Sequence, residues 1–411
     1  MHSIWSFRDA RLVIPARAIA AGGMSMGMIA LVLRVHDSGQ GPLAMTALMI
    51  CMALPAIAFM GLAGRVADSV DSRRVLVIGG LAQAVATVAL AVSSGLVANL
   101  VFVLVFSTAG TFTAPVWSAL VPRIVGDALI GKAVAWQQGL SSTIAPMGGA
   151  LGGVLVGRAG VAVALWVASG LLLALVVAAL AVRTRRGGPA DEHLSHEASG
   201  GGALAGLRII RKDSVLFPLF AGLIVLILVA EGVNVVEVFM ARDELGASPE
   251  AYGFSELFFG GGAVLGAVVA GRLTTTRTRA MVGALGFAAT GLVFALVGVA
   301  TAFWMYLVLA VFIGLTNAAA NASAGALLMS RVPDAHRGKV SSALNGVART
   351  ASVCALVLGG VVGAWLGPRL TFLTGGALTV AVGLATFVLV RAGLRRDAAA
   401  PSVPVAPQQV A

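Results

Sequence analysis

Long apolar stretches separated by short polar segments run along almost the whole chain. Two of the clearest are Val161–Val182 and Phe217–Ala230. An α-helix that crosses a bilayer needs about 20 mostly apolar residues, whereas a strand of a membrane barrel alternates apolar and polar residues over about ten. The unbroken stretches therefore predict membrane-crossing helices. We expect these helices at residues 12–33, 43–63, 75–95, 98–120, 133–156, 160–182, 215–240, 251–271, 280–299, 302–328, 340–364 and 369–391.

The composition agrees with this interpretation. Hydrophobic residues make up 59% of the 411 residues and charged residues only 11%, against about 25% charged residues in a soluble protein. In lipid every backbone N–H and C=O must be satisfied internally, which a helix achieves. We therefore expect an all-α polytopic membrane protein with twelve transmembrane helices. Cys51 and Cys354 lie in apolar stretches and are interpreted as small hydrophobic residues, not as a disulfide framework.

The net charge of +11 would suit a nucleic-acid partner, but the positions of the basic residues argue against one. Arginines and lysines gather in every second predicted loop, which is the distribution of the positive-inside rule. The pattern predicts that both termini and the central loop are cytoplasmic. The excess of arginine over lysine, with abundant alanine, glycine and valine, indicates a GC-rich bacterial genome, so we expect a bacterial plasma (inner) membrane. The loops on the opposite side of the membrane contain only four basic residues, Arg34, Arg158, Arg242 and Arg369.

The longest internal polar segment divides the chain into two parts of similar length. Its flanking glycines indicate a flexible cytoplasmic linker at 183–213 between helix bundles at 1–182 and 214–396. His193 and His196 lie in this linker, and a solvated loop explains them better than a metal site. The Ala- and Pro-rich segment 397–411 is expected to be a disordered cytoplasmic tail.

Short glycine-containing motifs recur at one constant offset of 207 residues. Gly64-Arg65 matches Gly271-Arg272, Gly131-Lys132 matches Gly338-Lys339, Gln138-Gly139 matches Asn345-Gly346, and Gly152-Gly153 matches Gly359-Gly360. Each pair falls at equivalent places in the predicted helix order. Parallel internal repeats of this kind are typical of transporters built from two related halves.

The segment Gly64–Arg74, Gly-Arg-Val-Ala-Asp-Ser-Val-Asp-Ser-Arg-Arg, is the most specific local motif. It places Asp68 at the expected cytoplasmic membrane edge, close to Arg65, Arg73 and Arg74. Gly64, together with Gly61, is expected to permit close helix packing. Asp68 and Asp71 could also be imagined as a metal pair, but no further carboxylates follow at helical spacing.

This motif resembles the loop between the second and third helices of the major facilitator superfamily, and the resemblance extends over nearly the whole chain. Gly64, Asp68, Arg73 and Arg74 fit the usual pattern, whereas Asp71 replaces a glycine. An aspartate there is typical of exporters that resemble the enterobactin exporter and related drug-efflux proteins. The resemblance implies two pseudo-symmetric six-helix bundles and a gating role for Asp68, with Arg74 as its expected partner. The second copy has Thr275 in place of the aspartate.

Three carboxylates inside the expected helices are candidates for binding substrate or protons, because ionisable groups are costly in a membrane. Glu231, Asn234 and Glu237 occupy an arc of about 120° on one helix, at about 100° per residue. Glu256 lies early in the next helix. A structural carboxylate, hydrogen-bonded to a neighbouring helix, is the alternative for each. It is favoured for Glu237, which we expect to lie near Arg242, and for Glu256. Glu231 is the best candidate to carry the proton.

Several other polar groups lie within the expected helices. Arg349 is about three turns into its helix and could pair with a carboxylate or an anionic substrate, while Asn317 and Asn321 could line a cavity. Hydrogen bonding between helices is the alternative for the asparagines. The fourth helix lacks the arginine found in many proton-coupled drug antiporters, since Phe106 stands four residues before Gly110.

From these features the sequence predicts a secondary-active transporter. The resemblance favours a proton-coupled exporter, or efflux antiporter, of small amphiphilic molecules or metabolites, such as drugs or siderophores, that works by alternating access as a monomer. A nutrient importer or uniporter of the same fold remains an alternative, and a polytopic membrane enzyme is the alternative of another class. We expect a small-molecule substrate, the proton and the lipid bilayer as partners, with no cofactor, metal or nucleic acid.

Overall fold

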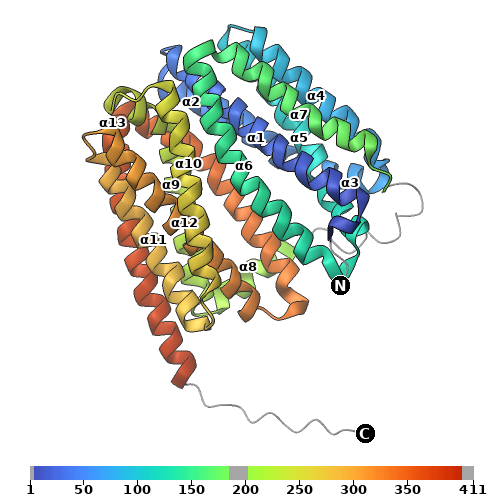
Figure 1. The fold of residues 1–411 in the computed structure, drawn as a ribbon. Coiled ribbons are helices and arrows are strands. Elements are labelled where there is room, and N and C mark those ends of the chain that lie inside the picture. Colours follow the sequence, from blue (N-terminus) through green and yellow to red (C-terminus); the bar gives the residue numbers. More distant parts are fainter. Residues whose placement is uncertain (1–3, 185–201, 400–411) are drawn as a thin grey trace, which may run out of the picture.

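The structure is a computed structural model that describes residues 4–184 and 202–399. These residues form thirteen α-helices and no strand (Figure 1). The helices are α1 (Arg8–Asp37), α2 (Gly41–Ala58), α3 (Met60–Ser69), α4 (Ser72–Val92), α5 (Leu96–Val125), α6 (Ile130–Ala159), α7 (Val161–Ala181), α8 (Gly202–Lys212), α9 (Leu216–Phe239), α10 (Pro249–Gly271), α11 (Thr276–Gly298), α12 (Phe303–Arg331) and α13 (Asp334–Ala399).

Eleven helical segments of the described chain are long and apolar enough to cross a membrane. The prediction of an all-helical membrane protein is therefore confirmed. The last segment, His336–Asp397, is 62 residues long and covers the last two predicted spans. α13 is broken at Gly367, whose φ of 75° lies in the left-handed region and which precedes Pro368. The chain bends there, between the two predicted spans.

The second predicted span, 43–63, is interrupted. α2 ends at Ala58 and α3 begins at Met60, with Phe59 between them at non-helical φ/ψ. Pro55 lies one turn before the break and removes one backbone N–H from the helix. The predicted linker 183–213 contains α8, and its residues 185–201, including both linker histidines, lie outside the described residues. α13 extends to Ala399, into the predicted tail, and residues 400–411 lie outside the described residues as well.

The helices pack as two groups. In the first, which we call the N-group, α1 packs on α6 and α7, and α4 packs on α5 and α7. In the second, the C-group, α9 and α11 pack on α13, and α10 packs on α12. The largest contacts between the groups join α6 to α10 and α2 to α13. Figure 1 shows the blue-to-green N-group beside the yellow-to-red C-group.

The two groups meet tightly at one end of the molecule, which we call the closed end. A methyl group added at Gly153 of α6 would lie 2.7 Å from the Cα atom of Gly253 in α10. In the other contact between the groups, Gly360 of α13 packs directly on Thr46 of α2, whose hydroxyl donates a hydrogen bond of 3.2 Å to the carbonyl of Leu356. Glycine at these positions lets the backbones approach.

The opposite ends of the same helices, which we call the open end, lack such contacts. Gly131 and Gly139 of α6, and Gly338 and Gly346 of α13, have no atom within 4 Å of an added Cβ. Gly61 and Gly64 of α3 are equally uncrowded. The expected close packing at Gly64 is therefore not found in this conformation, because the helices that could cover it lie apart.

Candidate functional site

A cavity of about 560 Å³ lies between the two groups of helices. The N-group contributes residues of α1 and α2, and the C-group contributes residues of α9 to α13. Its wall is largely apolar, with Met28, Met49 and Met52 on one side and Phe259, Phe294 and Phe372 on the other. Flexible methionines and aromatic rings can adapt to ligands of different shapes. The volume is that of a small-molecule site.

Glu231, Asn234 and Glu237 all line this cavity from α9. Their spacing puts them on one face of the helix, as the sequence suggests. The Ser352 hydroxyl of α13 donates a hydrogen bond of 3.3 Å to Oε1 of Glu231, and the Asn234 amide lies 3.5 Å from Oε2. These long contacts leave Glu231 loosely held.

Glu237 is held more firmly. The Tyr306 hydroxyl, on α12, donates a hydrogen bond of 2.5 Å to Oε1 of Glu237. The expected proximity to Arg242 does not produce an ion pair, because the guanidinium turns to the carbonyl of Ala247 at 2.7 Å and to Asp37 at 3.4 Å. Within the described chain Glu237 forms no salt bridge.

Glu256 lies in α10 at the junction between the two groups. A methyl group added at Gly149 of α6 would lie 2.9 Å from Cγ of Glu256 and 3.0 Å from the hydroxyl of Ser25. The stem of this C-group carboxylate is therefore packed against an N-group helix, while the side chain also lines the cavity. If α6 separates from α10, the surroundings of the Glu256 side chain must change.

The cavity has an unbalanced charge. Three glutamates line it, and no lysine, arginine or histidine of the described residues does so. Carboxylates inside a membrane protein are costly unless a proton or a cation neutralises them. The site therefore suits protons and positively charged ligands, and repels anions. Of the described residues, no cluster of His, Cys, Asp and Glu could hold a metal ion.

Two candidates from the sequence lie outside the cavity lining. Arg349 is exposed on α13, toward the open end. Asn321 is exposed one turn after Asn317 on α12 and donates a 2.7 Å hydrogen bond to the Asn317 side-chain oxygen, whereas Asn317 itself lines the cavity. Asn317 therefore lines the same cavity as the glutamates, whereas Asn321 and Arg349 do not.

The segment Gly64–Arg74, which we call the gating loop because of the role expected for Asp68, lies at the open end. Asp71 is the N-cap of α4 and accepts hydrogen bonds from the backbone N–H groups of Arg73, at 2.8 Å, and Arg74, at 3.4 Å. The Arg73 guanidinium donates to the carbonyl of Leu180 at 2.6 Å. Asp68 lies in the last turn of α3. The local role of Asp71 is thus to start a helix, as a short carboxylate before an N-terminus does.

Sequence reasoning missed two cavity residues. Tyr252 and Tyr306 are the only tyrosines in the chain, and both line the cavity. Both are buried, and both lie in helices of the C-group. These two residues could have been noticed in the sequence, because tyrosine is rare in this apolar chain. A buried tyrosine hydroxyl usually lies next to a polar group, so each tyrosine indicates a polar site.

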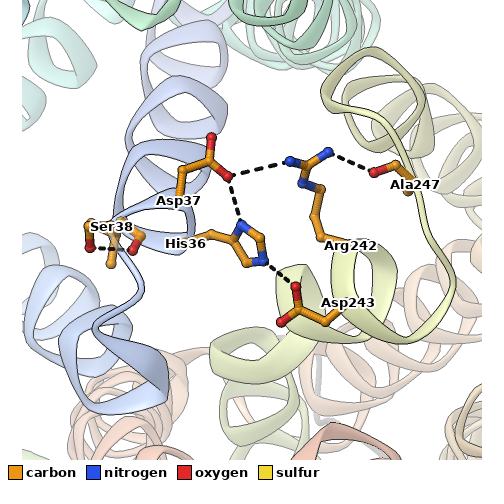
Figure 2. Close-up of polar contacts among 7 residues, drawn as sticks. His36, Asp37, Ser38, Arg242, Asp243 and Ala247 are labelled. Atoms are coloured by element: carbon orange, nitrogen blue, oxygen red, sulfur yellow. Dashed lines mark hydrogen bonds and ion pairs between the residues drawn. The ribbon is translucent and has the colours of Figure 1, made fainter.

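Sequence reasoning also missed a polar cluster at the closed end (Figure 2). His36 of α1 lies between two carboxylates, with Nδ1 2.9 Å from Asp37 and Nε2 2.8 Å from Asp243. Arg242 lies beside Asp243 in a π-helical turn, Met240–Glu244, that follows α9. His36 and Asp243 are 207 residues apart, which is also the offset of the internal repeat.

Comparison with known proteins agrees with the membrane-transporter class that the helices and the cavity define. The family model of the Major Facilitator Superfamily matches residues 13–242 and 227–409. The chain belongs to the major facilitator superfamily and is a multi-pass membrane transporter. It is 24% identical over 356 residues to the "Uncharacterized MFS-type transporter YfiS" of Bacillus subtilis (strain 168), covering 84% of each chain.

Solved structures share the fold. The nucleoside transporter NupG superposes with a TM-score of 0.72 at 14% identity, covering 93% of this chain and 99% of that one. A POT family transporter in complex with 5-aminolevulinic acid gives a TM-score of 0.73 at 11% identity, covering 94% and 97%. At such low identity the likeness concerns the fold alone.

Proposed function

We propose that this protein is a proton-coupled exporter of small amphiphilic cations that works by alternating access. The observation that carries the proposal is the cavity between the two groups, lined by three glutamates and no basic side chain of the described residues. Methionine and aromatic side chains supply the apolar part of such a site. This is the efflux branch that the Gly64–Arg74 motif resembles.

In this proposal the chain crosses a bacterial plasma membrane twelve times, because α13 crosses twice, on either side of Gly367. The two moving bundles are residues 1–182 and 214–396, and the protein acts as a monomer. The positive-inside rule puts both termini, the gating loop and α8 in the cytoplasm. The open end therefore faces the cytoplasm and the closed end faces outward, so that the cavity is accessible to a substrate from inside.

The substrate and the proton compete for the same glutamates. A cationic substrate that enters from the open end displaces a proton from the carboxylates, and a proton from outside later displaces the substrate. We assign substrate contact to Glu231, with Asn234 and Asn317 beside it, because its hydrogen bonds are long. Glu256 is assigned the coupling role, because its stem packs on α6 where the two groups must separate.

Glu237 and the gating loop have supporting roles in this proposal. The short hydrogen bond from Tyr306 fixes the position of the Glu237 side chain in the wall of the site. When the open end closes, Gly64 of α3 and the glycines of α13 approach each other. Asp68, with Arg74, then holds the gating loop against the other group of helices.

The test uses purified protein in liposomes with an imposed pH gradient, an internal pH dye and tetraphenylphosphonium as the cationic probe. The expected result is probe-induced proton flux that falls by at least about tenfold in Glu256→Gln and Glu231→Gln. Asp397→Asn is the control, because Asp397 is an exposed carboxylate near the end of α13 that does not line the cavity.

Two results would overturn parts of this proposal. Movement of the probe without proton flux would make the protein a uniporter. Transport of an anionic probe, with no binding of tetraphenylphosphonium, would reject the cationic substrate class.

A further inference from the structure

The polar cluster at the closed end requires one more proton than its groups hold in their ordinary neutral-pH forms. Each of the two contacts of His36, to Asp37 and to Asp243, needs a hydrogen between nitrogen and oxygen. A neutral imidazole carries one N–H, and an ionised carboxylate carries none. The observed geometry is complete only when the imidazole is protonated, or when one of the two carboxyl groups is.

The position of His36 links this proton to the contact between the helix groups. His36 and Asp37 are the last two residues of α1, in the N-group, whereas Asp243 lies in the turn after α9, in the C-group. The contact at 2.8 Å therefore crosses the junction. Because 207 residues separate the two partners, they occupy equivalent places in the two halves, where the halves meet end to end.

Further charged side chains surround the contact between His36 and Asp243. Arg242 reaches Asp37 at 3.4 Å, which gives a second link between the groups. Glu244 is paired with Arg369 of α13 at 2.5 Å, within the C-group.

Two further charged groups belong to helices packed nearby. They are Arg158 near the end of α6 and Glu250 near the start of α10. The ring of His36 lies on that of Phe239, with centroids 5.3 Å apart, and its side chain keeps 11% of its surface exposed. Water can therefore deliver a proton to a ring that is otherwise covered.

We propose that His36, Asp37 and Asp243 form a proton-binding site, separate from the cavity, whose occupancy holds the closed end shut. With the proton bound, both ring nitrogens donate and the two groups are joined. Without it, the ring has one N–H for two carboxylates, so either the contact to Asp37 within α1 or the contact to Asp243 across the junction is lost. The two negative charges are then no longer balanced by an imidazolium between the groups. Proton binding then shifts the population toward the conformation described here, because the site is assembled only in that conformation.

The consequence for transport rests on the proposed function and its orientation. If the closed end faces outward, a proton from the outside closes it and returns the carrier to the state that loads substrate from the cytoplasm. The cavity glutamates and this site would then respond to the same gradient at two successive steps. The proton site itself depends only on the contact across the closed end.

The test measures the conformation and needs no transported compound. Spin labels are placed at Gln40→Cys and Thr301→Cys, both exposed and in different groups at the closed end, in full-length protein in lipid nanodiscs with Cys51 and Cys354 replaced by serine. Distance distributions between the labels are measured by pulsed electron paramagnetic resonance from about pH 5 to about pH 8. We expect the population with a long distance between the labels, in which the closed end has opened, to increase about fivefold or more with rising pH.

Two substitutions at one position give opposite expectations. His36→Gln cannot bind the proton, so the long-distance population is high and independent of pH. His36→Arg keeps the positive charge at every pH, so this population is low and independent of pH. His336→Gln is the control, because His336 is exposed in the first turn of α13, at the open end, and should leave the wild-type pH profile unchanged.

A wild-type profile without pH dependence, or one that persists in both His36 variants, would overturn the proton site. Failure of proton-coupled flux in liposomes, with this pH profile intact, would instead reject the proposed function alone. The two proposals can therefore fail independently.

Discussion

The two ends of α6 and α13 differ although the same helices form both. At the closed end Gly148, Gly149, Gly152 and Gly153 of α6 are buried against neighbouring helices, whereas Gly131 and Gly139 of the same helix have open space beside them. A glycine without a neighbour lowers helix stability and brings no packing in return. Glycines at the open end are therefore best explained by a second conformation in which they pack.

The internal repeat makes this comparison sharper. Gly153 meets Gly253 of the other group, and Gly360 meets Thr46 of the other group. The offset of 207 relates Gly153 to Gly360 and Thr46 to Gly253, so that the two contacts are copies of each other. At the open end the same offset relates Gly131 to Gly338 and Gly139 to Gly346, all four of them uncrowded. Both halves are thus packed at one end and apart at the other.

The largest expected effect comes from a wedge at the closed end. In Gly153→Leu, the side chain meets the Gly253 backbone at 2.7 Å and the carbonyl of Pro249 at 2.6 Å. Such overpacking costs about 1–3 kcal/mol, which corresponds to a population change of about 5- to 150-fold. The closed end should open, and labels at Gln40 and Thr301 should move apart.

Gly139→Leu is the matched change at the open end of the same helix. Nothing lies within 4 Å of an added Cβ there, so the present conformation should tolerate it. If Gly139 packs when the open end closes, this variant should hold the protein in the present conformation. A shift in the same direction for both variants would contradict the comparison between the two ends.

A smaller effect is expected at the cavity. Tyr306→Phe removes the hydroxyl that donates to Glu237 and leaves that carboxylate without its hydrogen bond. We expect a loss of about 1–3 kcal/mol in the free energy of unfolding, measured by thermal denaturation in detergent.

Tyr252→Phe is the control for this change. Tyr252 also lines the cavity, but its hydroxyl makes no hydrogen bond to the described residues. The loss in this variant should be well below that of Tyr306→Phe. Equal losses would show that removal of either hydroxyl, rather than the bond to Glu237, governs stability.

The smallest effect is expected at an ion pair at the open end. Arg331 contacts Asp213 at 3.1 Å and Asp397 at 2.6 Å. Burial acts to lower the pKa of Arg331, but the hydrogen bond to Asp397 and the charge of Asp213 outweigh it and raise that pKa above its ordinary value. A raised pKa in a basic group gives stability that is fully present below the ordinary value and is lost only above it.

Arg331→Gln should therefore lower stability by about 1 kcal/mol or less, and by the same amount at about pH 6 and about pH 8.5. Thermal denaturation at the two pH values measures this. The result compares the ion pairs of Arg331 at the open end, whose contribution to stability should not change with pH, with the contact of His36 at the closed end. A loss that appears at only one pH would contradict the assignment of the stability to a permanently charged arginine.

Much of the helix order could be predicted from apolar stretches, because a membrane span needs a minimum length and leaves a clear pattern. The interruption at Phe59 could not, because a proline such as Pro55 bends a helix by an amount that its neighbours decide. The break of α13 at Gly367, in contrast, falls between the two spans predicted at 340–364 and 369–391. The helix α8, within the expected linker, was not predicted because it is short and amphipathic, with Ile210 buried on one side.

The cavity illustrates the same limit. Helical spacing is enough to put Glu231, Asn234 and Glu237 on one face, since that is local geometry. The depth of Arg349 in its predicted span did not reveal that this residue lies outside the cavity, because position along a helix does not fix which neighbours cover it. The contact of His36 with Asp243 joins residues 207 apart and exists only once the two groups have met.

Alternating access is tested most directly by following both ends of the molecule in the same preparation. One label pair reports the closed end, at Gln40→Cys and Thr301→Cys, and a second pair reports the open end, at Ser69→Cys and Ser342→Cys, all at exposed positions. Distances are recorded at low and high pH, with and without tetraphenylphosphonium. If the two groups alternate, the distance at the open end decreases whenever the distance at the closed end increases. Two distances that increase together, or that stay fixed under every condition, would contradict alternating access.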